Sequence, residues 1–189
     1  MPATNFFREN LNKSGIVLDA NDIYFKQTAR NRAMILGANR IEKLIVPVHA
    51  SSGKTKNVDV KIDLSMPWQR SMIRTLEAAY RNSPYYQYYD YLLLPTIEKK
   101  HIFLIDLQIE SLAAILKCMQ WSMPIWLKEN TDLSFIYQKT DNIYTPKVCL
   151  PYQQTFGREF VPQLSIIDLL FNLGPEAKNH LIKETQNEH

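Results

Sequence analysis

The hydrophobic periodicity of the chain changes near residue 65, and this change limits the folds open to it. Before that point, short apolar runs rich in β-branched residues cover 32–36 and 43–48, with G-A-N-R turn chemistry between them. These runs predict a β-hairpin. A third, half-buried strand is predicted where apolar and charged residues alternate, with the apolar positions at Val58, Val60 and Ile62.

After that point, apolar residues recur every three to four positions, which is the spacing of an amphipathic helix. Helices are predicted over 66–82 with Ser65 as N-cap, briefly after Pro84, over 106–121, over 166–173 and over 176–184. The inward residues of the third are predicted to be Ile109, Leu112, Ala113, Leu116 and Met119. P-I-W-L at 124–127 is predicted to return as a strand, and 128–151 as loop. The predicted fold class is mixed α+β, with a sheet made largely by 16–63 and helices from 66 onward packed on it.

Length and composition favour one globular domain. The chain has 189 residues, 46% hydrophobic and 22% charged, which suits a single core and excludes a disordered or fibrous protein. The domain is expected to span 1–189, with a divergent opening segment at 1–21 and a frayed tail at 184–189. The formal charge of +3 is too small to suggest nucleic-acid binding and is compatible with a small anionic ligand.

The sequence also bears on location and cofactors. No window has the 18 or more apolar residues of a membrane span, and no apolar leader is present, so a cytoplasmic protein without membrane insertion is expected. Two cysteines do not make a disulfide framework, and the four histidines are scattered, so neither a metal nor another cofactor is expected.

Two motifs that suggest chemistry have simpler interpretations. V-H-A-S-S-G-K-T at 48–55 nearly matches a phosphate loop, but it lacks the first glycine and a strand pattern follows where a helix is required. An exposed hairpin loop is predicted instead, with His49 at the surface. Cys118 and Cys149 have no histidine close in sequence that would activate a thiol, so neither is predicted to be a nucleophile.

A cationic segment is the first candidate binding element. Lys26, Arg30 and Arg32 lie within seven residues, and in an extended chain they would share one face able to hold phosphate or carboxylate. The same residues also suit a solvated edge strand whose charges discourage aggregation. Both interpretations remain open.

Tyrosines are dense between residues 80 and 91. Such a cluster suits stacking on a sugar or a base, but helical spacing also places tyrosines in a core with their hydroxyls at the surface. Core packing is the preferred interpretation.

Asp168 lies among aliphatic residues just inside a predicted helix. With Ser165 as N-cap, its position gives a capping box, and Leu164 facing Leu169 gives a hydrophobic staple. Gly174 then occupies the left-handed C-terminal position, and Pro175 opens the next helix. Capping explains Asp168 without chemistry, although a rigidly held carboxylate could also contact a ligand.

Several stretches, taken in order and spacing, carry a family resemblance over about residues 22–182. They are Y-F-K-Q-T-A-R-N-R at 24–32, A-N-R with L-I-V-P-V at 38–48, W-Q-R at 68–70, A-Y-R-N-S-P-Y-Y at 79–86, F-L-I-D-L-Q at 103–108, and P-Y-Q-Q-T-F-G with F-V-P-Q-L-S-I-I-D-L-L-F-N-L-G-P-E at 151–176. Together they resemble the WbqC-like family, bacterial proteins found with genes for O-antigen and other surface polysaccharides.

The chain departs from the family pattern in three places. The usual opening apolar strand is shortened to M-P-A-T-N-F-F, Ser71 stands where a histidine is common, and Arg40 stands where the turn usually has glycine. If that histidine carries a proton in the family, this chain would bind a ligand without turning it over.

The resemblance implies a role in surface-polysaccharide biosynthesis, with transfer of an aminoacyl or acyl group to a sugar or nucleotide-sugar. It gives no catalytic residues. The substrate-binding residues expected around one common cavity are Lys26, Arg30 and Arg32 for an anionic group, Trp68 and Tyr152 for stacking, and Gln154 with Asp168 for polar contacts. The alternative is a non-catalytic binding or scaffold partner of a pathway enzyme, with homo-oligomerisation left open.

Overall fold

The computed structural model describes residues 1–128 and 149–186 and has the mixed α+β fold that the periodicity predicts. The helices are α1 (Thr4–Asn10), α2 (Trp68–Tyr80), α3 (Tyr86–Glu98), α4 (Leu104–Cys118), α5 (Ile166–Leu173) and α6 (Ala177–Gln186), with 3-10 turns η1 (Asn57–Asp59) and η2 (Gly174–Glu176). The strands are β1 (Ile16–Asp19), β2 (Arg32–Leu36), β3 (Ile41–Ile45), β4 (Val48–His49), β5 (Lys61–Ile62) and β6 (Ile125–Lys128).

The described strands form three separate pairs, so the predicted single sheet over 16–63 is wrong. The predicted hairpin is present as antiparallel β2 and β3, with Arg32 opposite Ile45. P-I-W-L does form a strand, β6, but its partner is β1 near the start of the chain, paired in parallel with Ile16 opposite Ile125. The sequence could not indicate this pairing, because its two strands lie far apart along the chain.

The predicted third strand is mostly absent. Residues 57–59 form a 3-10 turn, and only Lys61–Ile62 pair as strand β5, with β4. Asn57 explains the difference, since its backbone N–H donates to Asp22 O at 2.9 Å and its side chain donates to Asp19 O at 3.0 Å. These two bonds fold the segment onto the loop after β1 instead of extending it.

The hairpin loop predicted at 48–55 is present, since β4 at its start pairs in antiparallel fashion with β5, which follows it. Gly53 has a φ of +75°, and its N–H donates to Tyr24 O at 2.8 Å. His49 is exposed, as predicted. No helix follows the loop directly, so the arrangement that holds phosphate in nucleotide-binding loops is not formed by these residues.

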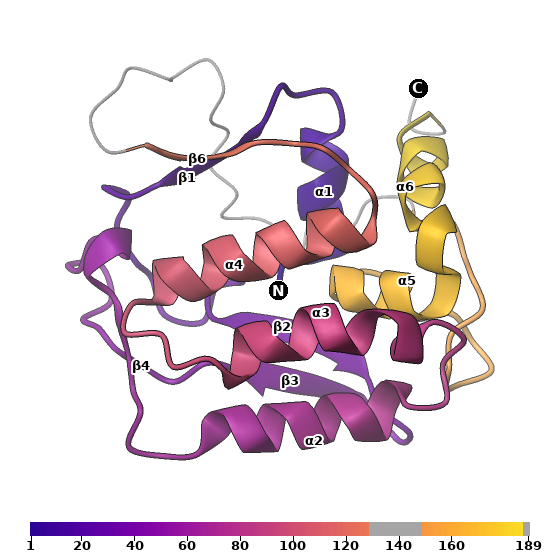
Figure 1. Cartoon of the computed structure of the whole chain (residues 1–189), viewed down its shortest axis with the longest axis horizontal. Helices are drawn as coiled ribbons and strands as arrows, with labels where there is room; N and C mark the ends of the chain where they lie inside the picture. Colours follow the sequence, from indigo (N-terminus) through magenta and orange to yellow (C-terminus); the bar gives the residue numbers. More distant parts are fainter. Residues whose placement is uncertain (129–148, 187–189) are drawn as a thin grey trace.

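Helices α2, α3 and α4 run side by side, and the β2–β3 hairpin lies behind them (Figure 1). The helix predicted over 66–82 is present as α2, which buries Trp68, Leu76 and Tyr80. The predicted Ser65 cap is wrong, because Pro67 occupies the N-cap position and no side chain caps the helix. Helix α3 is longer than the short helix predicted, and it continues through Pro95.

Helix α4 begins at Leu104, two residues earlier than predicted, and ends at Cys118. Leu112, Leu116 and Met119 are buried, but Ala113 is exposed, so the prediction for that residue is wrong. Residues 129–148, predicted as loop, lie outside the described residues, and 149–151 have no regular structure.

The core is centred on α5, whose residues from Ile166 to Phe171 are all buried. Tyr80 and Tyr86 are also buried, with ring centroids 5.0 and 5.1 Å from that of Phe171. Core packing is therefore confirmed for these two tyrosines, whereas Tyr88 and Tyr91 are exposed.

Both end helices, α1 and α6, pack against α5. The chain start is attached directly, because Ala3 pairs with Ser165 and Thr4 N–H donates to Leu164 O at 3.2 Å. Residues 184–186 belong to α6, contrary to the expected frayed tail, while 187–189 lie outside the described residues. None of the helices in the described parts of the chain has the length and hydrophobicity needed to cross a bilayer.

Candidate functional site

A small interior pocket lies between the β2–β3 hairpin and helices α2, α3 and α4. Its volume is about 30 Å³. The polar residues in its lining are Arg30, Asn31, Arg32, Trp68, Gln108 and Ser111. Apolar side chains of the hairpin and the helices complete the wall, so hydrogen bonds made inside the pocket are shielded from bulk water.

Two hydrogen-bond donors at the pocket are buried without a partner. Arg32 Nε and Trp68 Nε1 donate to no described residue. Arg32 is the first residue of β2 and Trp68 the first residue of α2, so strand and helix bring the two side chains to one place. A buried donor that lacks an acceptor costs about 1–3 kcal/mol, which makes such a pair unusual in a folded protein.

An acceptor faces the same pocket. Asn31 is held in place because its side-chain Nδ2 donates to Val46 O at 3.0 Å and its backbone carbonyl accepts from Val46 N–H at 2.9 Å. Its Oδ1 atom is buried and accepts from no residue in the described segments. Three residues of the pocket lining therefore carry a buried polar atom without a described partner, two of them donors and one an acceptor.

Arg30 contributes differently from Arg32, although both were expected to bind an anion. Its guanidinium forms an ion pair with Asp22 and donates to Ile23 O at 2.6 Å and to Asn57 Oδ1 at 2.9 Å. Its carbonyl accepts from Gln108 Nε2 at 2.8 Å. Arg30 thus joins three segments around the pocket, and its charge is already matched by a carboxylate.

Lys26 does not reach the pocket. It is exposed, its backbone N–H donates to Ser52 Oγ at 3.0 Å, and it is not part of the pocket lining. Residues 26–31 form turns, with Gln27 at a φ of +69°, so the predicted extended strip of Lys26, Arg30 and Arg32 is wrong. The turns separate charges that an extended chain would have aligned.

The late polar residues gather at a second place, around the carboxylate of Asp168. Tyr80 Oη donates to Oδ1 at 2.7 Å, and Tyr152 Oη donates to Oδ2 at 2.6 Å. Gln154 Nε2 donates to Oδ2 at 3.0 Å. Asp168 is fully buried, so these bonds take the place of water.

Burial raises the pKa of Asp168 above its ordinary value, while the hydrogen bonds from Tyr152, Tyr80 and Gln154 lower it in part. Burial next to this carboxylate also raises the pKa values of Tyr80 and Tyr152 well above 10. Both phenols therefore remain protonated donors at neutral pH.

The predicted capping box is wrong. Ser165 is the N-cap residue of α5, but its hydroxyl donates to Pro2 O at 3.2 Å, and no side chain caps the helix. The carboxylate of Asp168 is directed at Tyr80, Tyr152 and Gln154 instead of back at the cap. Asp168 therefore joins three parts of the fold.

Gln154 is fully engaged within the protein. Besides Asp168, its Nε2 donates to Val161 O at 2.9 Å, and its Oε1 accepts from Val161 N–H at 2.8 Å. These bonds fold residues 154–161 onto the start of α5. Tyr152, Gln154 and Asp168 thus form a structural unit, which we call the clamp. None of the three residues lines the interior pocket.

The structure divides the seven predicted residues between separate places. Arg30, Arg32 and Trp68 line the interior pocket, whereas Tyr152, Gln154 and Asp168 form the clamp, and Lys26 lies at the surface. The cavity lined by Arg32 includes neither Tyr152 nor Asp168, so it is not the common cavity expected from the sequence. Trp68 is buried in the core and is not an open stacking platform.

Cys118 and His101, which could act as a nucleophile and a base, do not line the pocket. Cys118 is buried, and burial raises its pKa to about 11, so its thiol stays protonated at neutral pH. His101 is buried and its Nε2 lies 3.1 Å from Thr96 O. Within residues 1–128 and 149–186 there is no cluster of His, Cys, Asp or Glu that could hold a metal ion.

Sequence reasoning missed Asn31, Gln108 and Ser111 as pocket residues. Asn31 and Gln108 do fall inside stretches that carry the family resemblance, Y-F-K-Q-T-A-R-N-R and F-L-I-D-L-Q. Their position inside these stretches is the sequence feature that could have indicated them as pocket residues.

Comparison with known proteins adds one finding. A family model described as the WbqC-like protein family matches residues 1–145 and 132–180. No curated protein and no solved structure matches the chain.

Proposed function

The chain belongs to the WbqC-like protein family, and on that premise we propose that it acts in surface-polysaccharide biosynthesis by binding the carboxyl or acyl end of a small ligand. The site of binding is the interior pocket formed by Asn31, Arg32 and Trp68. The body of the ligand, a sugar or nucleotide-sugar part, remains outside the pocket.

The single observation that supports this proposal is the set of unpartnered polar atoms. Arg32, Trp68 and Asn31 line one pocket, and in each a side-chain polar atom, Arg32 Nε, Trp68 Nε1 or Asn31 Oδ1, is buried and bonds to none of the described residues. Buried polar groups in native proteins nearly always have a partner, so a group of three points to a partner beyond the described residues, which we propose to be a ligand. Two donors suit the oxygens of a carboxylate or acyl group, and the acceptor suits an amine N–H or a hydroxyl.

The pocket volume restricts the ligand to a small group. A pocket needs a volume of about 10–15 Å³ to hold one water molecule. A pocket of about 30 Å³ therefore holds a group of a few heavy atoms, such as a carboxylate or an aminoacyl end, and is too small for a sugar ring. The donor and acceptor pattern matches an amino-acid end, which agrees with the aminoacyl transfer that the family resemblance implies.

A second candidate function is binding without turnover, as a non-catalytic partner of a pathway enzyme. The observation that favours it is the lining of the pocket, in which the described residues include no histidine, cysteine or carboxylate. Acyl transfer needs a base on the attacking atom, and Asp168 is enclosed in the clamp. The composition of the lining thus favours binding of a ligand without turnover over acyl transfer.

The test is a binding measurement on the full chain by calorimetry with four probes: glycine, acetate, glycinamide and glucose. We expect glycine to bind best, acetate and glycinamide to bind more weakly because each lacks one group, and glucose not to bind. Arg32→Met removes the donor while keeping an unbranched apolar side chain, and a lost charge-assisted hydrogen bond should weaken glycine binding about tenfold or more. Lys26→Met removes a charge outside the pocket and should leave binding unchanged.

The proposal fails if no probe binds the wild type, or if Arg32→Met binds glycine as well as Lys26→Met does. A thermal-unfolding control separates folding from binding, because both variants must retain a cooperative transition for the comparison to count. Product formation from an activated glycyl donor and an amino sugar then separates the two candidate functions. Turnover supports the transferase, and tight binding without turnover supports the non-catalytic partner.

A further inference from the structure

A second hollow, distinct from the interior pocket, lies at the surface between the turn that follows β2 and the exposed side of α2. Its volume is about 750 Å³, within the usual range of small-molecule sites. We call it the arginine groove and define it by its polar lining, which consists of Asn39, Arg40, Glu42, Arg70, Ser71, Arg74 and Thr75.

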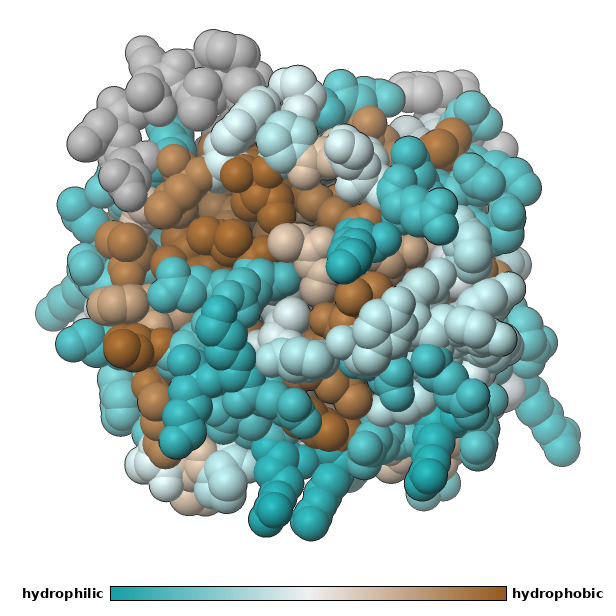
Figure 2. All heavy atoms as spheres, in the orientation of Figure 1, coloured by the Kyte–Doolittle hydropathy of each residue, from teal (hydrophilic) through white to brown (hydrophobic). Residues whose placement is uncertain are grey.

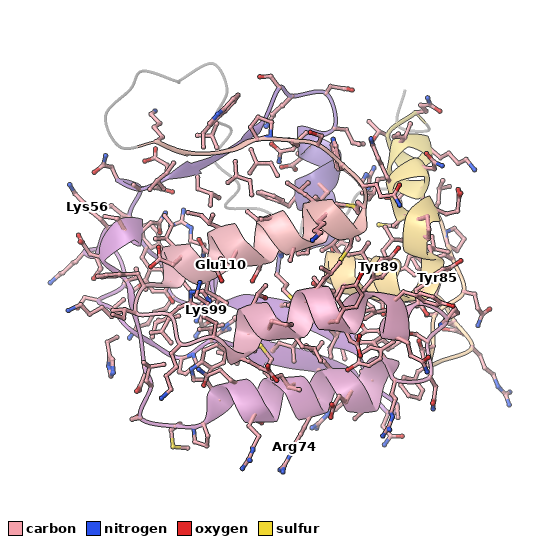
Figure 3. The ribbon with its side chains drawn as sticks, in the orientation of Figure 1. Lys56, Arg74, Tyr85, Tyr89, Lys99 and Glu110 are labelled. Carbon is pink, nitrogen blue, oxygen red and sulfur yellow. The ribbon has the colours of Figure 1, made fainter. Side chains whose placement is uncertain are left out.

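Helix α2 separates the arginine groove from the interior pocket. Trp68 and Met72 of this helix line the interior pocket, whereas Arg70, Ser71 and Arg74 line the groove. Hydrophilic side chains project from the edge of the molecule along which α2 runs, and Arg74 extends there away from the ribbon (Figures 2 and 3). The two sites therefore use different faces of one helix, share no lining residue and can be tested independently.

Positive charge dominates the groove. Its lining holds three arginines against one carboxylate, Glu42, which leaves a net charge of +2. Glu42 is committed to Arg40, whose Nε donates to it at 2.9 Å. Arg70 and Arg74 form no ion pair with any residue in the described part of the chain.

This arrangement disfavours the helix when the groove is empty. Arg70 and Arg74 are four residues apart on α2, where like charges repel by a few tenths of a kcal/mol. Arg40 adds a third cation from across the groove. A bound anion would convert this repulsion into attraction.

The chemistry of the lining suits phosphate. Guanidinium groups pair with phosphate oxygens through two parallel hydrogen bonds, and hydroxyl and amide groups such as those of Ser71, Thr75 and Asn39 add single donors. Two linked phosphates carry at least two negative charges, which matches the charge of the groove. No aromatic side chain belongs to its described lining, so a nucleobase finds no ring to stack on.

We propose that the arginine groove binds the diphosphate part of a small molecule, through Arg40, Arg70 and Arg74. The inference does not depend on the proposed function, because none of these residues lines the interior pocket.

The experiment measures binding of pyrophosphate, uridine diphosphate, uridine monophosphate and uridine to the full chain by calorimetry at low and at moderate salt. We expect pyrophosphate and the diphosphate to bind with similar strength, the monophosphate to bind more weakly, and uridine not to bind. Higher salt should weaken binding, since the groove is open to solvent. The double variant Arg70→Ala/Arg74→Ala should bind pyrophosphate about tenfold more weakly or worse, because two charge-assisted contacts are lost.

Arg81→Ala is the matched control. Arg81 is exposed, directly follows the last residue of α2, and lies outside the groove, so its loss changes the net charge without changing the site. It should leave pyrophosphate affinity within about twofold of the wild type, since a remote exposed charge contributes little. Helix content by circular dichroism checks that α2 persists in every variant.

Three results would overturn the proposal. The first is equal pyrophosphate affinity for the double variant and Arg81→Ala, and the second is binding of uridine as strong as that of its diphosphate. The third is binding to anionic lipid vesicles with no binding to pyrophosphate, which would assign the groove to a membrane surface. Arg32→Met should retain pyrophosphate binding and the double variant should retain glycine binding, so failure here is distinguishable from failure of the proposed function.

Discussion

The environment of Asp168 has two opposing effects on the ionisation of its carboxyl group. Its carboxylate is removed from water, which disfavours ionisation, and three side chains donate to it, which favours ionisation. The first effect is larger, so its pKa is raised. The native state therefore binds this proton more tightly than the unfolded chain does.

The sign of the pH dependence follows. The stabilising contribution of a raised carboxyl pKa is complete below the unfolded value of about 3.9 and is lost as pH rises through the higher native value. Stability attributable to Asp168 should therefore fall as pH rises from about 4 towards neutral. The donors from Tyr80 and Tyr152 limit that fall, because they stabilise the ionised form.

We predict that Tyr152→Phe and Tyr80→Phe each destabilise the protein by about 1.5–3 kcal/mol at pH 7, the usual contribution of a hydrogen bond to a charged group. The loss should be smaller near pH 4, where Asp168 is more often protonated. Urea unfolding at both pH values measures it.

Tyr91→Phe is the control for these variants, because Tyr91 is largely exposed and lies outside the clamp. It should change the free energy of unfolding by less than about 0.5 kcal/mol. A loss for Tyr152→Phe that is equal at the two pH values would contradict the assigned role of the Asp168 charge.

For single residues, the sequence indicates which side chains can bind an anion, but it does not indicate which partner each side chain has in the fold. Arg30 and Arg32 are near neighbours of the same type, yet Arg30 is held by Asp22 and Asn57 while Arg32 Nε is left without a described partner. This difference depends on where the loops before β2 and after β4 meet. The contact between these two loops cannot be predicted from the local sequence, so the candidate site was only partly predictable.

Among the secondary-structure elements, helices were predicted best. Apolar spacing located α2, α4 and α5 because each buries one stripe or its whole surface against the core. Short strands were harder to predict, because two or three alternating residues do not distinguish a strand from a turn held by side chains. The segment starting at Asn57 is an example, since its bonds to the loop after β1 replace the predicted strand.

The end of α5 gives an element-scale prediction. Gly174 has a φ of +57°, and a Cβ at this position would lie 2.4 Å from Tyr85 Cδ1. Gly174→Ala should therefore destabilise the protein by about 2–4 kcal/mol, from backbone strain together with overpacking. Thermal or urea unfolding measures the loss.

Gly53→Ala is the matched control for this prediction. Gly53 also has a positive φ, +75°, but its added Cβ would lie 3.6 Å from the nearest atom, Phe25 Cε1. It should carry only the backbone cost of about 1 kcal/mol. Equal losses in the two variants would show that contact with Tyr85 contributes nothing.

For the whole molecule, a buried ion pair joins the first helix to the last. Arg8 Nε of α1 lies 3.5 Å from Glu184 Oε2 of α6, and both side chains are almost completely buried. Glu184 also accepts from Leu150 N–H at 2.9 Å. This contact attaches both end helices to the segment that leads into the clamp.

We predict that Glu184→Gln, which keeps an oxygen for Leu150, destabilises the protein by about 3–5 kcal/mol, because the buried charge of Arg8 loses its paired carboxylate. Arg8→Met/Glu184→Gln should be more stable than Glu184→Gln alone, since it leaves no such charge. Chemical unfolding of all variants in a double-mutant cycle gives the coupling energy.

The exposed pair Arg40–Glu42 supplies the control for burial. Glu42→Gln should cost less than about 1 kcal/mol, because exposed ion pairs contribute little. If Glu184→Gln costs no more than Glu42→Gln, the buried pair does not hold the end helices in place.

The parallel pairing of β1 with β6 has a consequence for the order of events during protein synthesis. Ile16 leaves the ribosome long before its partner Ile125 is translated. The interval between the synthesis of Ala3 and that of its partner Ser165 is longer still. Contacts so distant along the chain close slowly, because much of the chain must first be brought together. The amino-terminal segment should therefore stay accessible to chaperones and proteases in the nascent polypeptide until α5 has been made, and stalled intermediates shorter than that should be digested first.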